Sequence, residues 1–286
     1  MVETNALLHQ GDNVVLTENF NFSQSIFELE EPSYASLSDD FLTPVNYINK
    51  KLEGFENLIK CGHINARSIP KHLHEISNVL FRIKSKFLCL GAVETFITKN
   101  TPSSAFNVPG YNFFHVDRIE KSRGGVGCYV DIDYPAKQIK LPVEMAQPEM
   151  LFVEITVGTV KIAVGVIYKS PLIPYTVFAN IHENILFVSA KYEHCIIMGD
   201  MNIDHLKVDS SPLKFFNSYF TEPFAFTQII DKPTRIAKTT DKNNKTKISS
   251  TLIDLMLVGN SDNVKCHGII DTPGISDHCL TFMAYS

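Results

Sequence analysis

The chain has 286 residues, of which 44% are hydrophobic and 20% are charged, and this composition supports a packed globular core in one large domain or two modest ones. No apolar run approaches the roughly 18 residues of a membrane-spanning helix, and the opening residues MVETNALLHQGDN lack the basic and apolar stretches of a secretory signal. The net charge of −5 is unevenly distributed, because residues 1–59 carry ten acidic and two basic residues while the remainder is mildly basic.

The acidic leader spans residues 1–57. It is rich in turn formers and weakly periodic, so we expect it to be disordered or loosely docked, although its apolar patches would also suit a binding partner. The six cysteines of the chain are scattered without a CxxC pair, and several lie in apolar runs such as FLCLGAV and EHCIIMG. They predict buried free thiols in a reducing compartment, nuclear or cytoplasmic and not secreted, and they argue against a zinc site.

In the body, residues 58–286, apolar runs alternate with short polar segments. Nine runs rich in β-branched and aromatic residues predict strands, in the order LIKCGHIN, FLCLGAVETF, YNFFHVDR, GGVGCYVDI, MLFVEITV, VKIAVGVIYKSP, CIIMGDMNID, TLIDLMLVG and CLTFMAYS. Helical spacing appears at residues 72–85, at 175–190 and, more weakly, at 211–220. Many strands with few helices predict two packed sheets covered by outer helices. No repeat or Gly/Ser-rich linker divides this region, so we expect one domain.

Polar side chains of a restricted kind end six of these strands. They are Asn65, Glu94, Tyr168, Asp200 with Asn202, Asp254, and Asp277 with His278. The spacing of Asp200 and Asn202 in GDMNID directs both side chains to one side of the strand. A single polar strand end is usually a turn, a cap or a salt bridge. Six ends of these types together predict a site that holds a hard cation and moves a proton.

In this chain order the residues resemble the endonuclease/exonuclease/phosphatase superfamily, and within it the apurinic-type endonuclease domain of LINE-type (non-LTR) retrotransposons. The matching motifs are HINARS (63–68), VET (93–95), RGGVGCYV (123–130), VIYKSP (166–171), GDMNID (199–204), KPTR (232–235), STLIDLM (250–256) and SDH (276–278). The KPTR and TLID motifs favour the retrotransposon branch. The resemblance covers about residues 58–286 and implies an α/β (α+β) fold, a four-layered sandwich of two packed mixed β-sheets flanked by helices.

The resemblance also implies a magnesium-dependent endonuclease that nicks duplex DNA by phosphodiester hydrolysis and leaves a 3′-hydroxyl, as in target-primed retrotransposition. The implied Mg²⁺ ligands are Glu94, Asn65 and Asp277, with Mn²⁺ as a substitute and no small-molecule cofactor. The implied catalytic set is Asp200, Asn202, His278, Tyr168, Asp254 and Asn65. In this set Asp254 would orient His278, Asn202 would donate to a phosphate oxygen, and either Asp200 or His278 would be the general base.

Local basic segments are the candidate DNA contacts, because the net charge is weak. The segment 116–125 supplies Arg118, Lys121 and Arg123, and the segment 231–249 carries six basic and two acidic residues. In the resembled family the loop between PTR and LID is a hairpin near the target duplex, which makes Lys238, Lys242, Lys245 and Lys247 candidate phosphate contacts. A solvated loop is the alternative for these lysines. Thr234, Arg235 and Arg67 complete the predicted DNA-binding set, and Ser68 and Ser276 are predicted to support the site loops.

Three other functions stay open at this point. A superfamily phosphatase or phosphodiesterase would act on an inositol phosphate, sphingomyelin or poly(A). A non-catalytic descendant would only bind DNA, and a structural scaffold would use the polar strand ends as caps. The lack of tryptophan argues against abasic-site repair. The chain ends eight residues after His278, so we expect any reverse transcriptase partner to lie outside it and expect no membrane partner.

Overall fold

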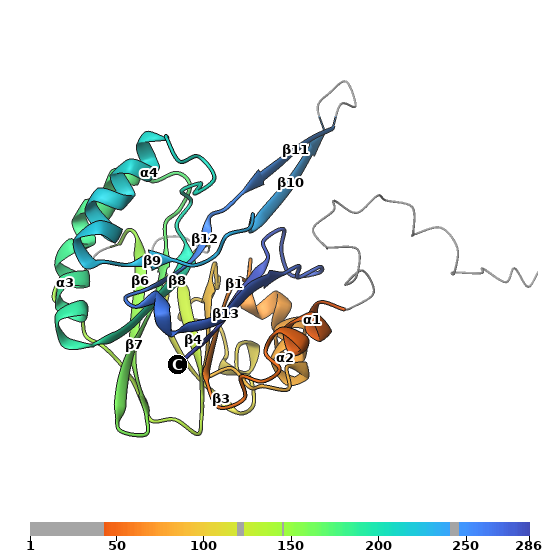
Figure 1. Cartoon of the computed structure of the whole chain (residues 1–286). Coiled ribbons are helices and arrows are strands. Elements are labelled where there is room, and N and C mark those ends of the chain that lie inside the picture. Colours follow the sequence, from red (N-terminus) through yellow and green to blue (C-terminus); the bar gives the residue numbers. More distant parts are fainter. Residues whose placement is uncertain (1–42, 119–122, 145, 241–245) are drawn as a thin grey trace, which may run out of the picture. The chain divides into compact units, whose positions relative to one another are not determined.

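Two six-stranded sheets lie face to face between two layers of helices in the computed structural model of the chain (Figure 1). The structure describes residues 43–118, 123–144, 146–240 and 246–286. All nine predicted strands are present within these residues. The predicted sandwich of two mixed sheets flanked by helices is confirmed.

The first sheet has the strand order β13-β14-β1-β2-β4-β3. Its strands are β1 (Ile59–Asn65), β2 (Cys89–Val93), β3 (Tyr111–Val116), β4 (Val126–Asp131), β13 (Val264–Ile270) and β14 (Leu280–Tyr285). β1 and β2 are parallel, whereas β14 runs antiparallel to β1. The carboxyl ends of β1 and β2 and the beginning of β14 therefore meet at one edge of this sheet.

The second sheet has the strand order β5-β6-β7-β8-β12-β9. Its strands are β5 (Ala136–Gln138), β6 (Glu149–Val157), β7 (Val160–Tyr168), β8 (His194–Asp200), β9 (Thr227–Gln228) and β12 (Asp254–Val258). β7 and β8 are parallel, and β12 runs antiparallel to β8. A separate ribbon of β10 (Arg235–Thr240) and β11 (Thr246–Thr251) projects away from both sheets (Figure 1). This ribbon confirms the hairpin that the resemblance implied.

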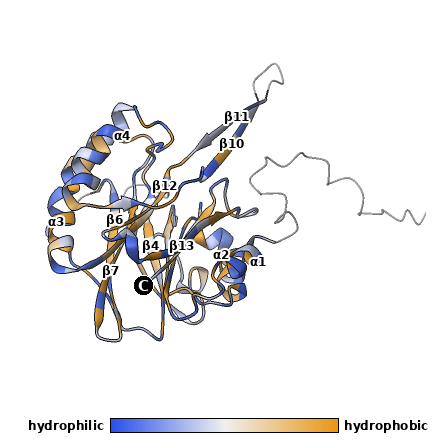
Figure 2. Cartoon of the chain, viewed as in Figure 1, coloured by the Kyte–Doolittle hydropathy of each residue, from blue (hydrophilic) through white to orange (hydrophobic). Residues whose placement is uncertain are grey.

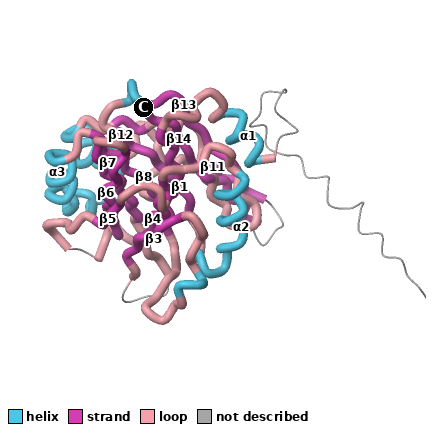
Figure 3. Tube along the Cα trace, turned by 90° about the horizontal axis from the view of Figure 1, so that it is seen from below, coloured by secondary structure: helices cyan, strands magenta, loops and turns pink. Residues whose placement is uncertain are grey.

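The helices form the outer layers. α1 (Pro44–Lys51) and α2 (Ile69–Arg82) pack on the outer face of the first sheet, whereas α3 (His182–Lys191) and α4 (Ser211–Phe216) pack on that of the second (Figure 3). A 3₁₀ turn at Tyr175–Ile181 precedes α3, and a π turn at Asn217–Thr221 follows α4. Shorter 3₁₀ turns occur at Ser103–Ala105, Glu222–Phe224 and Ser261–Asn263. No helix in the described part of the chain has both the length and the apolar character needed to span a bilayer.

Continuous apolar strands arise because both faces of the central strands are buried. In β8 the side chains of Ile196 and Met198 enter the core between the sheets, while those of Cys195 and Ile197 enter the core under α3 and α4. Successive side chains of a strand point to opposite faces, so a strand covered on both sides must be apolar throughout. Figure 2 shows the hydrophobic residues concentrated on the strands between the helical layers.

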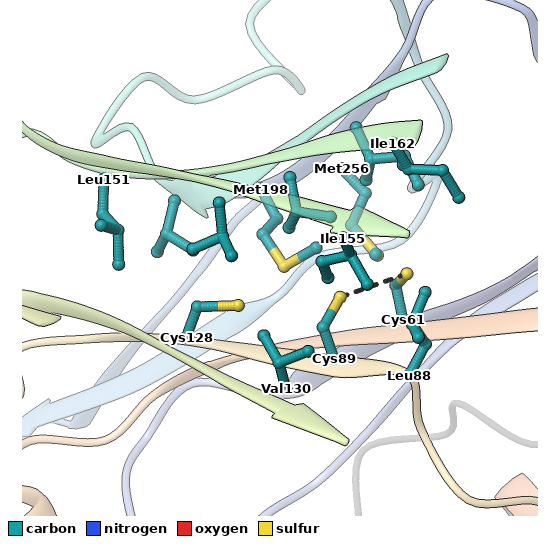
Figure 4. Packing of buried hydrophobic residues seen from close by; sticks show 14 of the residues in the cluster. Cys61, Leu88, Cys89, Cys128, Val130, Leu151, Ile155, Ile162, Met198 and Met256 are labelled. Carbon is teal, nitrogen blue, oxygen red and sulfur yellow. Dashed lines mark hydrogen bonds between the residues drawn. The ribbon is translucent and has the colours of Figure 1, made fainter. Parts of the chain in front are cut away.

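The core between the sheets contains a row of thiols. Cys61, Cys89 and Cys128 lie on neighbouring strands, are 0% exposed, and place Cys89 Sγ 3.4 Å from Cys61 Sγ (Figure 4). The hydrogen bond to Cys89, together with burial, raises the pKa of the Cys61 thiol well above its ordinary value. All six cysteines are free, as predicted, and Cys266 alone is half-buried instead of buried.

The packed body begins earlier than the predicted boundary at residue 58. Thr43 accepts a hydrogen bond from the backbone N–H of Asn46 and Pro44 occupies the first turn, so α1 has an N-terminal cap. Ile48 and Leu52 are 0% exposed in the core beneath α2. Residues 43–57 are therefore not part of a loose leader. The remaining leader prediction, for residues 1–42, lies outside the described residues.

Candidate active site

The predicted polar strand ends meet at one end of the sandwich. Asn65 ends β1, and Tyr168 and Asp200 end the parallel neighbours β7 and β8 as register partners. Asp254 begins β12 directly opposite Asp200 in antiparallel register. Glu94 follows β2, and His278 precedes β14. Because these strands are buried on both faces, their ends hold the polar side chains on a rigid frame.

Asn65 joins two carboxylates. Its Nδ2 donates to Glu94 Oε1 and to Asp200 Oδ2, each at 3.1 Å, and the side chain is completely buried. The backbone N–H of Arg67 donates to Asn65 Oδ1 at 3.3 Å, which fixes the orientation of the amide. The hydroxyl of Tyr168 donates to the same Oε1 of Glu94 at 3.2 Å. Four residues predicted from separate motifs thus form one hydrogen-bonded group.

Asp254 is the centre of a second group. Its Oδ2 lies 2.8 Å from His278 Nδ1 and accepts a 2.8 Å hydrogen bond from the hydroxyl of Thr234. Its Oδ1 lies 3.4 Å from Nε2 of His63, which is also fully buried. Asp254 is therefore placed to orient the His278 ring, as the motifs predicted. The two groups meet where His278 Nδ1 lies 3.8 Å from Asp200 Oδ2.

Burial and charge set the protonation of this centre. Burial and the nearby Asp254 charge raise the pKa of Asp200 to about 7. Burial acts to raise the pKa of Asp254 as well, but the adjoining His278 and His63 outweigh it and hold that pKa below its ordinary value. Burial acts to lower the pKa of His278, but Asp254 and Asp200 together raise it to about 9. The raised pKa of His278 favours its protonated form, and the raised pKa of Asp200 makes it a stronger base than an ordinary carboxylate.

Thr234 is buried instead of facing DNA. Its side chain is 0% exposed, and its hydroxyl accepts from the backbone N–H groups of Ile253 and Asp254 at 3.1 and 3.0 Å while donating to the Asp254 carboxylate. This hydroxyl uses its donor and its two acceptor positions within the protein. The predicted DNA contact at Thr234 is wrong for this reason, and the residue supports Asp254.

Asn202 forms part of the turn after β8. Its backbone has a φ of 47°, and its N–H donates to Asp200 Oδ1 at 3.0 Å. Its side-chain Nδ2 donates to the carbonyl oxygen of Lys169 at 2.8 Å. The amide thereby connects the end of β8 to the end of β7, and this bond uses one of its two N–H donors. The phosphate contact of Asn202 stays a prediction.

Asp277 lies between two arginines. Arg67 Nη2 is 2.7 Å from Asp277 Oδ1, and Arg235 Nε donates to Asp277 Oδ2 at 3.0 Å. These ion pairs contribute to lowering the pKa of Asp277 against the effect of burial. The predicted metal ligand Asp277 is thus neutralised by residues that were predicted to contact DNA.

The two predicted supporting serines stabilise backbone near the site. Ser276 Oγ accepts from the backbone N–H of His278 at 2.9 Å, and Ser68 Oγ caps α2 by accepting from the N–H of Lys71 at 3.4 Å. Both contacts order loops that carry site residues.

The remaining residues predicted to contact DNA differ in their exposure. Arg123 is exposed, and Lys238 and Lys247 are exposed on opposite strands of the β10–β11 ribbon. Arg118 is mostly buried, with a side chain 18% exposed and Nε donating to Glu149. Lys121, Lys242 and Lys245 lie outside the described residues.

His63 and Glu149 are buried at this end and were not predicted. His63 lies in the HINARS motif that was already singled out, and its alternation with Asn65 along β1 was the available signal. Glu149 begins β6 opposite Tyr168 and is 5% exposed. A carboxylate at the head of the apolar run MLFVEITV was a signal for Glu149, but its partners are distant in sequence.

The carboxylate of Glu94 is suited to bind a hard cation. Among the described residues no hydrogen bond reaches Glu94 Oε2, and Mg²⁺ is usually held by one or two carboxylates and by water. Asp200, Asp254 and His278 also have ligand atoms within 4.8 Å of one another. All three members of that second cluster are buried, whereas Glu94 is half-buried.

Comparison with known proteins places this geometry in a known fold. No family model and no curated protein matches the sequence. Among solved structures, the endonuclease domain of TRAS1, a telomere-specific non-LTR retrotransposon, superposes with a TM-score of 0.59 at 14% identity, over 79% of this chain and 98% of that one. The AP endonuclease LMAP from Leishmania major has a TM-score of 0.62 at 14% identity, over 80% and 87%.

This chain has the endonuclease/exonuclease/phosphatase fold. A third structure of this fold, the 3′ phosphatase NExo from Neisseria bound to a product DNA hairpin, has a TM-score of 0.58 at 16% identity, over 80% of this chain and 99% of that one. These three proteins are an endonuclease domain, an AP endonuclease and a 3′ phosphatase, so the fold carries more than one activity. At these identities the likeness establishes the endonuclease/exonuclease/phosphatase fold and leaves the reaction to be argued from the site.

Proposed function

We propose that this protein is a Mg²⁺-dependent endonuclease that nicks duplex DNA by phosphodiester hydrolysis and leaves a 3′-hydroxyl. The observation that carries the proposal is the buried Asn65 amide, which joins the candidate metal ligand Glu94 and the candidate base Asp200 in one hydrogen-bonded group. The Asp254–His278 pair adjoins it. A metal ligand, a proton acceptor and a cationic donor are the components that phosphodiester hydrolysis requires.

In this proposal Glu94 would hold the ion, and Mn²⁺ would substitute for Mg²⁺. The bound ion would withdraw charge from the scissile phosphate and stabilise the departing 3′ oxygen. Asp200 would accept the proton of the attacking water, because Asn65 and the N–H of Asn202 orient both of its oxygens. The His278 imidazolium, aligned by Asp254, would donate to the phosphate. Asp200 is thereby favoured over His278 as the base.

Duplex DNA is supported as the substrate by the projecting β10–β11 ribbon. Its exposed Lys238 and Lys247 would contact backbone phosphates, which positions DNA without reading its sequence. A 3′-hydroxyl at a nick is a primer, so a reverse transcriptase is the class of partner that would use the product. The free thiols support a reducing, nuclear or cytoplasmic location.

The test is conversion of supercoiled plasmid to open circles with Mg²⁺. Asp200→Asn and His278→Gln should each lower the nicking rate by about 10²–10⁴-fold, and EDTA should abolish nicking. Asp131→Asn is the matched control, because Asp131 is a buried aspartate paired with Lys86 at the opposite end of β4. Direct extension of the nicks by a DNA polymerase would report the 3′-hydroxyl.

The second candidate is a phosphatase or another phosphodiesterase of this fold, as the description of the Neisseria protein suggests. A folded wild type that releases phosphate from a 3′-phosphorylated DNA end, without nicking plasmid, would favour that candidate. Duplex binding without either reaction would favour a non-catalytic descendant.

A further inference from the structure

Glu149 is a buried carboxylate with every oxygen engaged. Its Oε1 accepts hydrogen bonds from Arg118 Nε and, at 2.9 Å, from Gln147 Nε2, and its Oε2 accepts from the backbone N–H of Gly125 at 2.5 Å. Glu149 is 5% exposed and is the register partner of Tyr168. A buried carboxylate is expensive unless such donors satisfy it. The network has two arms, one from Glu149 through Arg118 and the other from Glu149 through the loop at Gly125.

The Gly125 arm reaches the backbone that follows Glu94. Phe96 N–H donates to the Gly124 carbonyl at 2.9 Å, and Thr95 N–H donates to the Gly125 carbonyl at 3.3 Å. A side chain on Gly125 would collide with Thr95 Oγ1, so only glycine permits this approach. The braced segment is strained, because Glu94 has a φ of 51° and Phe96 has a φ of 54°.

The Arg118 arm reaches Tyr168. Arg118 Cζ lies 5.7 Å from the centre of the Tyr168 ring, within cation–π range. A side chain on Gly124 would overlap the guanidinium, so this glycine lets the loop close over Arg118. Tyr168 in turn donates its hydroxyl to Glu94 Oε1. Both arms therefore converge on the same carboxylate.

We propose that Glu149 is a positioning residue for Glu94, acting through the Gly124–Gly125 loop on the Glu94 backbone and through Arg118 and Tyr168 on the Glu94 carboxylate. This inference rests on the proposed function, in which Glu94 holds the metal. Partners beyond the direct ligands orient a metal site, and their loss commonly costs about 10–100-fold in metal affinity or activity. Glu149 touches neither metal nor substrate in this scheme.

The test compares Glu149→Gln with Glu154→Gln in the full chain. Glu154 lies on the same strand and is equally buried at 5% exposed. It accepts a hydrogen bond from a tyrosine and forms ion pairs with two lysines, but it is five residues from Glu149 toward the opposite end of β6. Calorimetric titration with Mn²⁺ and no DNA gives metal affinity. Hydrogen exchange of peptides containing Thr95 and Phe96 reports directly on the hydrogen bonds from their N–H groups to the Gly125 and Gly124 carbonyls. Arg118→Lys, at a partly exposed side chain, removes one arm if Glu149→Gln proves unstable.

Glu149→Gln and Arg118→Lys should raise the Mn²⁺ dissociation constant about 10–100-fold, and Glu149→Gln should speed exchange at residues 95–96. Glu154→Gln should lose stability with unchanged Mn²⁺ affinity. Wild-type affinity and exchange in folded Glu149→Gln would overturn the inference while plasmid nicking by the wild type still upheld the proposed function. A wild type that neither binds Mn²⁺ nor nicks plasmid would overturn both.

Discussion

Thr234 illustrates how one uncharged side chain determines the geometry of a charged centre. Its hydroxyl connects the backbone at the beginning of β12 to the carboxylate of Asp254, which in turn aligns His278. Removing one partner from such a buried group leaves the others unsatisfied, which costs about 1–3 kcal/mol per group. We therefore expect Thr234 to affect catalysis although its buried side chain does not contact DNA.

Thr234→Val should lower kcat for nicking by roughly 10–100-fold through misplacement of Asp254 and His278. The KM for DNA and its salt dependence should stay unchanged, since a buried hydroxyl neutralises no phosphate. Steady-state nicking at several salt concentrations measures both parameters. Thr234→Ser keeps the hydroxyl and should retain most of the activity. A raised KM with normal kcat in Thr234→Val would instead indicate a DNA contact.

At the scale of elements, Glu154 connects three strands and a helix end. It accepts from the hydroxyl of Tyr192, which follows α3, and pairs with Lys137 on β5 and Lys161 on β7. The Tyr192 hydrogen bond and the two lysines lower the pKa of Glu154 to about 2 from an ordinary 4.5. A carboxylate with a lowered folded-state pKa stabilises the fold above its unfolded-state pKa and loses that effect as the pH falls toward the folded value.

Glu154→Gln should therefore unfold at lower urea concentration than the wild type at pH 7, and the difference should shrink between pH 4.5 and pH 2. Urea titrations at pH 7, 4 and 2.5 measure it. Glu193→Gln, at an exposed glutamate beside Tyr192, should have little effect at any of these values. A difference that persisted unchanged at low pH would show that the contribution of Glu154 does not come from its charge.

The β10–β11 ribbon supports a prediction about DNA affinity. Lys238→Ala and Lys247→Ala should each weaken duplex binding, and each should reduce the slope of log K against log salt by about 1. Binding isotherms at 50–200 mM salt with any duplex suffice, because phosphate contacts carry no sequence information. Lys265→Ala is the control, since Lys265 lies at the end of β13 that pairs near Tyr285, away from the site. If the salt slopes of all three variants equal that of the wild type, the ribbon does not contact DNA.

At the scale of the whole molecule, three hydrophobic cores hold the four layers together. α1 contributes to the core between the first sheet and its helices. Leu52→Ala should lower the free energy of unfolding by about 2–5 kcal/mol, because Leu52 is 0% exposed beneath α2. Leu186→Ala on α3, where the leucine is 52% exposed, should stay within about 0.5 kcal/mol of the wild type. Urea unfolding compares the two. Equal small effects would mean that α1 is not packed in solution.

Sequence periodicity predicted the layers but not every neighbour within them. The central strands, such as β8, are recognisable because burial on both faces makes them continuously apolar. β13 was missed because it is a half-exposed edge strand, and α1 was missed because its cap at Thr43 follows an acidic stretch that resembles a loose segment. Asn65 and Asp200 were identifiable at strand ends, whereas the network of Glu149 depends on packing between distant segments, which local spacing does not encode.

The placement of β1 between β2 and β14 has a consequence for synthesis. Residues 59–65 leave the ribosome more than 200 residues before residues 280–285, which complete their hydrogen bonding. At translation speeds of about 5–20 residues per second, the centre of the first sheet stays unpaired on one side for roughly 10 seconds or longer. His278 reaches Asp254 only when the last strand docks. A nascent chain whose residues 280–285 are still in the exit tunnel therefore has no assembled site.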